Sequence, residues 1–167
     1  PPVDFALEPS EAADDSLVRV PGTRIYVDGE PVTLADFHIG RFEVTNREYK
    51  AFVDAGAYRR KDYWEHEFVD DGETLSFDAA MARFVDTTGR PGPSTWIGGT
   101  YPAGQEDYPV AGISWYEAMA YARFAGRELP TVHHWQRAHA PATVTWQILK
   151  SNLEADGPAP VGQYEGT

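Results

Sequence analysis

The segment Asp107–Ala138, DYPVAGISWYEAMAYARFAGRELPTVHHWQRA, predicts a helix, a turn and the start of a second helix. Ser114 is a good N-cap residue, and Glu117 follows three residues later. In this capping-box pattern each side chain accepts a backbone N–H from the other residue. Apolar residues then recur at helical spacing, and Gly126 suits the position just after a helix end. The segment therefore predicts architecture, and it does not by itself indicate a chemistry.

A second capping box, earlier in the chain, predicts the other main helix. Thr45 is its N-cap and Glu48 is its reciprocal partner. Tyr49, Phe52 and Val53 follow on one face of the helix, at spacings of three and four residues. A helix this short persists only if its apolar face is buried. We therefore expect these three side chains to enter a core.

The rest of the chain divides into a tail and one predicted domain. Residues 1–16 are acidic and lack apolar periodicity, which predicts a tail or linker. Residues 17–167 are expected to form a single domain, with 57–106 as a long insertion. Strands are expected early in that domain, with a hairpin turn at Asp28-Gly29. Ser76 is expected to cap a helix over the residues FDAAMARFVDTT.

Composition excludes several classes of function. A formal net charge of −12 makes nucleic acid and anionic membrane surfaces poor partners. The 167 residues contain no cysteine, which excludes disulfides, thiolate catalysis and cysteine-ligated metals within this chain. No apolar run approaches the roughly 18 residues of a membrane span, so no membrane insertion is expected. None of this distinguishes a cytoplasmic from an extracytoplasmic location.

The histidines do not form a metal-binding pattern. Two ligands on one helix face need a spacing of about four residues, whereas His133 and His134 are adjacent. His139 lies five and six residues beyond them, so the rings would diverge. His38 and His66 stand alone and are expected to serve packing or capping. Surface polar roles are the favoured interpretation for the pair at 133 and 134.

Two loop segments are candidates for function. The Gly/Pro-rich loop 89–104 needs docked aromatics to be ordered, and Trp96 and Tyr101 are the residues that can anchor it. Together with His133 and His134, these two aromatics are the candidate partner or ligand surface. The other segment carries five acidic residues without the spacing of a calcium loop, so a solvated face is favoured: Glu65, Glu67, Asp70, Asp71 and Glu73.

Three ordered blocks resemble a known family. They are FHIGRFEVTNREYKAFVDAG at 37–56, YPVAGISWYEAMAYARFAGRELPT at 108–131 and HW at 134–135. Their order and spacing resemble the formylglycine-generating enzyme, or sulfatase-modifying factor, family. The insertion resembles a subgroup of that family found as modules fused to bacterial serine/threonine kinases. The resemblance covers about residues 18 to 165.

The resemblance implies an α+β, modified C-type lectin-like fold that is rich in loops, with two main helices and few short strands. The family continues beyond the point matched by Thr167, so the chain is expected to lack its C-terminal segment. Where the family has glutamate in the third capping box, after Thr131, this chain has His134. We expect the helix start there to be weaker by about 0.5–1 kcal/mol. The family's calcium segment is matched in part by Asn152, Leu153 and Asp156, so calcium is the candidate cofactor.

Two functions follow from the resemblance. The first is a non-catalytic binding or scaffolding module within a larger bacterial protein, because the family's copper-dependent cysteine oxidation needs cysteines that this chain lacks. The alternative is the N-terminal portion of a metal-dependent oxidoreductase whose catalytic residues lie beyond residue 167. No catalytic residue is assigned within the chain. Expected partners are other domains of the parent protein, a protein or small-molecule ligand, or a second copy that covers exposed helix faces.

Overall fold

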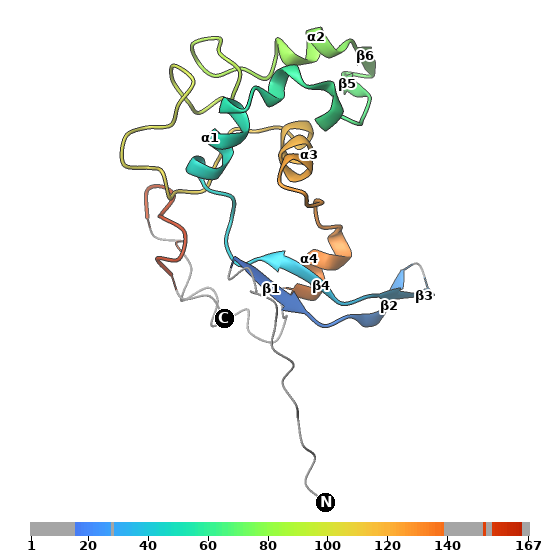
Figure 1. Ribbon diagram of the computed structural model, residues 1–167. Helices are drawn as coiled ribbons and strands as arrows, with labels where there is room; N and C mark the ends of the chain where they lie inside the picture. Colours follow the sequence, from blue (N-terminus) through green and yellow to red (C-terminus); the bar gives the residue numbers. More distant parts are fainter. Residues whose placement is uncertain (1–15, 28, 139–151, 153–154, 165–167) are drawn as a thin grey trace, which may run out of the picture. The chain divides into compact units, whose positions relative to one another are not determined.

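The computed structural model describes residues 16–27, 29–138, 152 and 155–164 (Figure 1). The chain divides into two compact units, residues 1–41 and 42–167. The first unit is built from strands: β1 (Leu17–Val20), β2 (Thr23–Val27), β3 (Glu30–Leu34) and β4 (Phe37–Gly40). The second unit carries the helices: α1 (Asn46–Asp54), η1 (Ala57–Arg59), η2 (Lys61–Tyr63), β5 (Phe68–Asp70), β6 (Glu73–Leu75), α2 (Phe77–Met81), α3 (Trp115–Phe124) and α4 (Val132–Ala138).

The first unit consists of two antiparallel strand pairs. β2 and β3 form the predicted hairpin, and β1 pairs with β4. Gly29 has a φ of 86°, a left-handed conformation that suits a tight turn. Gly22 lies so close to the following turn that an added Cβ would meet the carbonyl oxygen of Leu34 at 2.2 Å. Position 22 therefore accepts only glycine without a backbone shift.

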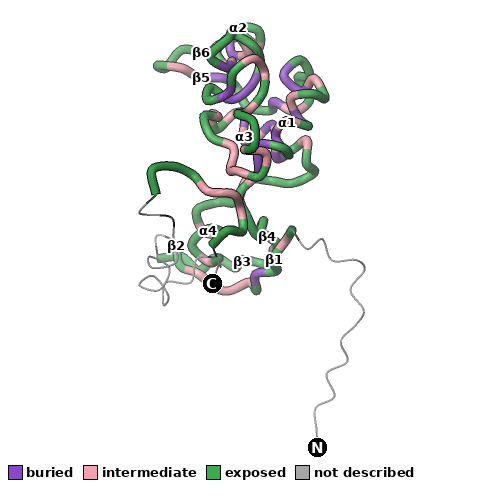
Figure 2. The backbone as a smooth tube through the Cα atoms, turned by 90° about the vertical axis from the view of Figure 1, so that its left-hand side faces the viewer, coloured by how far each residue is buried: buried purple, intermediate pink, exposed green. Residues whose placement is uncertain are grey.

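The core of the second unit is aromatic and joins segments distant in sequence. Tyr49 and Phe52 of α1 are fully buried, as their spacing predicts. The Tyr49 ring stacks on Tyr121 of α3 with 5.3 Å between centroids, and Phe52 meets Phe124 at 5.4 Å. Figure 2 shows buried residues gathered along α1, α3 and the segment that leads to α2. Offset and edge-to-face contacts of this kind add to the stabilisation from burial.

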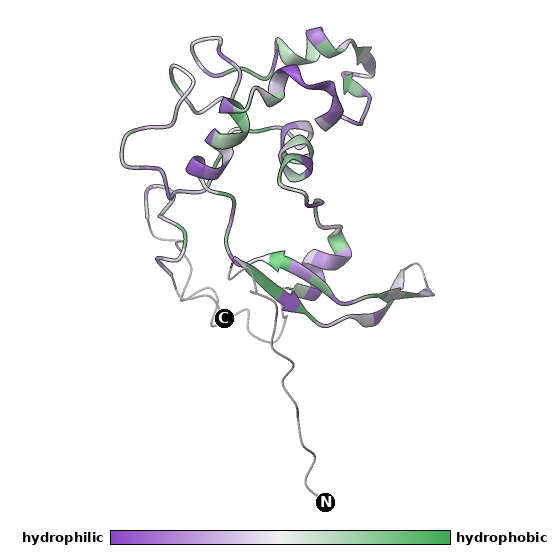
Figure 3. Cartoon of the chain, in the orientation of Figure 1, coloured by the Kyte–Doolittle hydropathy of each residue, from purple (hydrophilic) through white to green (hydrophobic). Residues whose placement is uncertain are grey.

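The predicted insertion 57–106 is part of this core. It contributes four buried aromatic side chains: Tyr58, Trp64, Phe68 and Trp96. Trp64 also donates its indole N–H to the carbonyl oxygen of Ala57 over 3.1 Å. Figure 3 shows hydrophobic and hydrophilic residues interspersed along this part of the chain. The segment is therefore an integral part of the unit, and its buried aromatic side chains hold its long loops in place.

One predicted helix is shorter than expected. Ser76 does cap α2, since its hydroxyl accepts the N–H of Ala79 over 3.2 Å, but the helix ends at Met81. Beyond it the backbone turns, and Phe84 accepts a hydrogen bond from the N–H of Gly92. Residues 82–88 therefore do not continue the helix, although their sequence pattern predicts it. The mixture of helices and small antiparallel sheets agrees with the predicted α+β class.

Among the described helices, none has both the length and the apolar character that crossing a membrane requires.

Candidate functional site

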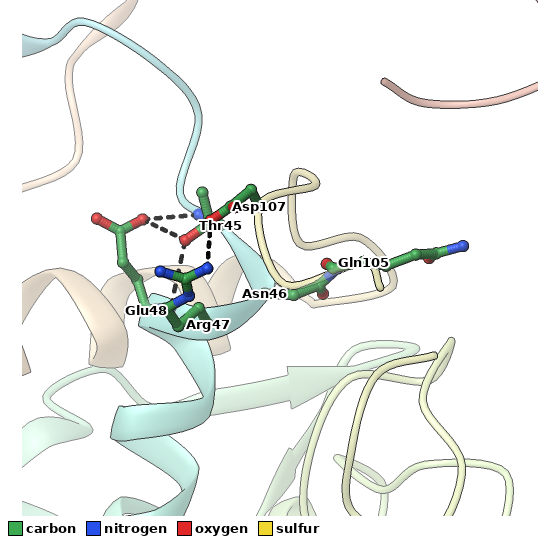
Figure 4. Close-up of polar contacts among 6 residues, drawn as sticks. All are labelled: Thr45, Asn46, Arg47, Glu48, Gln105 and Asp107. Atoms are coloured by element: carbon green, nitrogen blue, oxygen red, sulfur yellow. Dashed lines mark hydrogen bonds and ion pairs between the residues drawn. The ribbon is translucent and has the colours of Figure 1, made fainter. Parts of the chain in front are cut away.

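The α1 capping box forms as predicted. The Thr45 hydroxyl accepts the backbone N–H of Glu48 over 3.2 Å, and the Glu48 carboxylate accepts the N–H of Thr45 over 2.8 Å (Figure 4). Glu48 is exposed to solvent. Beside it, Arg47 and Asp107 form an ion pair at 2.9 Å, also drawn in Figure 4. The start of α1 is therefore tied to the chain that leads into α3.

Asn46, the first residue of α1, is hydrogen-bonded to the long loop that spans residues 86–112. Its amide nitrogen donates to the carbonyl oxygen of Gln105 over 2.9 Å, while its amide oxygen accepts the indole N–H of Trp96 over 3.0 Å. Asn46 is only 5% exposed. Pairing both the donor and the acceptor of this buried amide stabilises the fold, because an unpaired buried polar group costs about 1–3 kcal/mol of stability. Sequence reasoning placed Asn46 in a family block and assigned it no role.

Asp86 organises the same loop from its other end. Its carboxylate accepts four hydrogen bonds: from the N–H and hydroxyl of Thr88 at 2.7 Å each, from the N–H of Arg90 at 3.0 Å and from the N–H of Gly99 at 2.6 Å. Burial alone would raise the pKa of Asp86, but these hydrogen bonds, led by the Thr88 hydroxyl, lower that pKa to about 2. Asp86 is thus ionised at neutral pH and acts as an internal anion for the loop.

The middle of the loop is also hydrogen-bonded to the last residues of the loop, just before α3. The Ser94 N–H donates to the carbonyl oxygen of Gly112 over 2.8 Å, and the Thr95 hydroxyl donates to the carbonyl oxygen of Ala111 over 2.8 Å. Gly112 has a φ of 75°, and a Cβ there would lie 2.6 Å from the Ser94 hydroxyl. Residues 86–112 thus form an ordered loop with fixed contacts at both ends.

Glu117 forms the α3 capping box and reaches a second partner that the motif does not predict. One carboxylate oxygen accepts the N–H of Ser114 over 2.7 Å, and the other accepts the Tyr58 hydroxyl over 2.6 Å. The Tyr49 and Tyr58 hydroxyls are 3.1 Å apart, which extends the chain of hydrogen bonds. Glu117 is 3% exposed.

Burial raises the pKa of a carboxyl at both positions, but the net pKa shift of Glu117 is upward whereas that of Asp86 is downward. Burial is the largest cause at Glu117. It raises the pKa of Glu117, and the hydrogen bonds from Ser114 and Tyr58 offset only part of that effect. Burial also raises the pKa values of Tyr58 and Tyr49, with Glu117 adding to both shifts. These tyrosines therefore stay protonated and act as donors within the core.

The structure corrects the predicted ligand surface at Trp96. Its side chain is 1% exposed and lies in the core, so it cannot contribute to a surface. Tyr101 is partly buried and packs its ring on Trp96 at 5.5 Å. Both residues anchor the loop, as expected. Their anchoring role is structural, and exposed groups of the loop must carry any recognition.

His133 and His134 are partly buried residues of α4. The His134 Nδ1 atom lies 2.7 Å from the Thr131 hydroxyl and accepts the Thr131 N–H over 3.3 Å, while the Thr131 hydroxyl accepts the N–H of His134. These contacts reproduce a capping box with imidazole in place of glutamate. His134 therefore supplies a reciprocal contact that the sequence did not predict, and the expected weakening of the helix start stays a prediction.

The calcium prediction concerns a segment that the structure describes in part. Asn152 donates from its amide to the carbonyl oxygen of Gly157 over 2.8 Å, and its amide oxygen accepts the Tyr164 hydroxyl over 3.0 Å. Asp156 is exposed, and Leu153 lies outside the described residues. No group of three or more histidine, aspartate or glutamate residues with metal-binding geometry occurs in the described part of the chain. Calcium binding at Asn152 stays a prediction. A melting temperature that a chelator leaves unchanged would contradict it.

Two other sequence candidates have structural partners. In the acidic segment, Glu65 pairs with Arg123 and Asp70 pairs with Arg83. His66 packs on the exposed ring of Trp115 with 4.9 Å between centroids. His38 lies on β4 opposite Arg19, and His139 falls outside the described residues.

The comparisons with known proteins agree with this architecture. The family model for the sulfatase-modifying factor enzyme 1-like domain matches residues 6–163. This chain belongs to that family. The match includes both capping-box helices and the ordered loop between them, so the resemblance read from the sequence blocks is confirmed.

Several relatives of the chain carry enzyme names. Hercynine oxygenase of Mycolicibacterium thermoresistibile is 34% identical over 149 residues, which cover 80% of this chain and 32% of the relative. Hercynine oxygenase of Mycobacterium tuberculosis is 35% identical over 147 residues, covering 80% and 33%. Formylglycine-generating enzyme of Thermomonospora curvata is 30% identical over 165 residues, covering 83% and 54%. The chain thus spans about a third of the first two relatives and about half of the third.

Proposed function

We propose that this chain is a non-catalytic framework and binding module of a larger bacterial protein. The observation that carries the proposal is the use of its buried polar groups. Asn46, Asp86 and Glu117 are the buried amide and carboxylates of the described residues, and each is held by donors or acceptors of the chain itself. Groups committed in this way stabilise a shape and are poorly placed to act on a substrate.

The ordered loop 86–112 supports the binding part of the proposal. It contains no helix or strand, yet Asp86, Asn46 and Gly112 fix its conformation. Long loops held by a rigid scaffold are the usual place for recognition residues. Because the loop is already ordered before binding, no free energy of binding is lost in ordering it. Other domains of the parent protein, or a second copy of the chain, are the partners proposed.

Exposed aromatic residues of α3 and α4 add to this argument. Trp115 and Trp135 are both more than half exposed. Large apolar side chains left in water favour contact with another protein surface. Trp115 is also the first residue of α3, directly after the N-cap Ser114, so a partner that covers it would meet a rigid element. The dimer expected from the sequence remains a proposal of the same kind.

The names of the relatives favour a second candidate function. The chain would then be the N-terminal portion of a metal-dependent oxidoreductase related to hercynine oxygenase or to formylglycine-generating enzyme. The 167 residues contain no cysteine, so a cysteine-ligated metal would need groups outside them. On this alternative, the present residues hold the framework and the rest of the protein carries the reaction.

Oxygen consumption by the full parent protein separates the two candidates. It should be measured with copper(I) and a cysteine-containing peptide, and separately with iron(II), hercynine and a thiol, against metal-only controls. The framework proposal predicts no uptake above the controls in either assay. Substrate-dependent uptake would overturn it and support the oxidoreductase. Correct folding of the protein in both assays is checked by a cooperative thermal transition.

A further inference from the structure

An open hollow of about 470 Å³ lies beside α1. Its walls come from the second half of α1, from η1 and from two turns of the loop that follows α2, which can be followed in Figure 1. Small-molecule sites typically have volumes of about 300–1,000 Å³, so the hollow has the size of a ligand site. Its lining includes the apolar residues Val53, Tyr58 and Pro91 and the charged residues Lys50, Asp54, Arg59 and Arg90.

The charges of this lining are mostly positive. Asp54 is its one acidic residue, and its carboxylate pairs with the Lys50 ammonium group at 2.5 Å. Arg90 donates one guanidinium N–H to the carbonyl oxygen of Gly98 over 2.7 Å. Within the described residues, neither Arg59 nor Arg90 has a carboxylate partner. An arginine has five N–H donors, so both side chains retain donors for a ligand.

This arrangement differs from that of several other cations in the same unit. The sequence contains 26 acidic and 14 basic residues, so carboxylates outnumber cations. In the described part of residues 42–167, five cationic side chains pair with carboxylates: Arg47, Lys50, Arg60, Arg83 and Arg123. Arg59 and Arg90 instead share one hollow. A bound anion would be attracted by both positive charges.

The wall that carries Arg90 is rigid. The backbone N–H groups of Arg90 and Gly99 both donate to the buried carboxylate of Asp86, at 3.0 Å and 2.6 Å. Thr88 adds a further bond to the same loop, from the N–H of Gly98 to its hydroxyl at 3.1 Å. A site whose backbone is fixed before binding loses little freedom when the ligand arrives.

We propose that this hollow binds a small organic oxyanion, a phosphomonoester or a carboxylate, through the guanidinium groups of Arg59 and Arg90. A guanidinium group matches the planar pair of oxygens on either anion and binds them through two parallel hydrogen bonds. The apolar part of the ligand would lie against Val53 and Pro91. The site is independent of the proposed framework function, since it holds whether or not the parent protein is an enzyme.

Amide NMR of the full chain tests the site. Phenyl phosphate, phenylacetate and inorganic phosphate are titrated separately, so that the two organic anions and the free ion are distinguished. We expect saturable shifts at Arg90, Gly98 and Gly99 with at least one organic anion. Arg59→Gln should raise the apparent Kd by roughly tenfold, because one bidentate, charge-assisted contact is lost.

The neighbouring arginine provides a matched control. Arg60 pairs with Asp62, packs over the Tyr63 ring at 4.5 Å and does not line the hollow. Arg60→Gln should therefore leave the Kd unchanged. Both arginines are exposed, so neither substitution should shift the thermal transition. Absence of saturable shifts with all three probes would overturn the proposal, and so would equal weakening in the two variants.

Discussion

The two main helices begin with the same local motif in different surroundings. At α1, Glu48 accepts the N–H of Thr45 over 2.8 Å, and at α3, Glu117 accepts the N–H of Ser114 over 2.7 Å. Glu48 lies in solvent, whereas Glu117 is buried and also accepts the Tyr58 hydroxyl. The motif therefore determines where a helix starts, and tertiary packing determines how much the glutamate contributes to folding stability.

This difference has an energetic reason. An exposed capping side chain competes with water, and its loss typically costs about 0.5–2 kcal/mol. A buried carboxylate that holds two donors is harder to replace, because each donor left unpaired costs about 1–3 kcal/mol. Glu117 thus joins α3 to η1, while Glu48 stabilises α1 alone.

The largest expected effect is that of Glu117→Ala. We expect it to lower the free energy of unfolding by about 3–4 kcal/mol, since it leaves the Ser114 N–H and the Tyr58 hydroxyl without their acceptor and opens a gap in the core. Glu48→Ala is the matched control, with an expected loss of about 1 kcal/mol. Urea unfolding measures both. Equal losses in the two variants would break the comparison.

Asp86→Asn should have the next largest effect, a loss of about 2–3 kcal/mol, because a carboxylate with four hydrogen bonds is replaced by an amide that can accept fewer. Hydrogen exchange should accelerate at the N–H groups of Thr88, Arg90 and Gly99, with that of Glu48 as an unaffected reference. Unchanged protection at all three loop amides would contradict the role given to Asp86.

The same residue predicts an acid transition. Because the folded-state pKa of Asp86 is lowered from 3.8 to about 2, its stabilising contribution is present above the unfolded value. That contribution is lost as the pH falls through the interval between these two values. The difference in unfolding free energy between the wild type and Asp86→Asn should therefore narrow in that interval. A difference that is constant down to pH 2 would show that the charge is unimportant.

Glu117→Gln tests the opposite direction of pH dependence. Burial raises the folded-state pKa of Glu117 above its ordinary value of 4.5, so the folded protein binds the proton more tightly than the unfolded chain does. The stabilisation from this protonated form is fully present below 4.5 and is lost as the pH rises through the raised pKa. Glutamine is neutral throughout, so the wild type should lose stability relative to Glu117→Gln as the pH increases. Parallel urea midpoints across this range would contradict the burial argument.

The smallest expected effect concerns the third capping box. His134→Glu should keep the acceptor for the Thr131 N–H and add a negative charge near the start of α4, a gain of about 0.3–0.5 kcal/mol. His133→Glu, one residue earlier, is the control, because no contact with Thr131 involves its side chain. Thermal denaturation monitored by circular dichroism is the measurement. A larger gain at 133 than at 134 would argue against the cap.

Local patterns were sufficient for the helix starts and for part of the core. Serine or threonine followed by glutamate predicted both boxes, and the spacing of Tyr49 and Phe52 predicted their burial. The contacts of Glu117 with Tyr58 and of Asn46 with Gln105 could not be predicted, because each joins residues 59 positions apart along the chain.

The errors have physical causes as well. The local pattern predicted that the helix capped by Ser76 continues beyond Met81. In the structure, hydrogen bonds of Phe84 and Asp86 with residues 90–99 replace helical hydrogen bonds there. The contact of His134 with Thr131 was not predicted because capping rules name glutamate, although another acceptor can reach the Thr131 N–H. Asp86 and Thr88 carried a recognisable signal, since aspartate followed two residues later by threonine favours a side-chain-bonded turn.

The tie between Tyr58 and Glu117 also constrains how the protein is made. A ribosome must add 59 residues after Tyr58 before the carboxylate that accepts its hydroxyl exists. At about 5–20 residues per second, this takes roughly 3–12 s. During synthesis the aromatic face of α1 has no α3 to pack against, so the emerging chain presents an apolar surface for that time. Chaperone demand should therefore peak before α3 leaves the ribosomal tunnel.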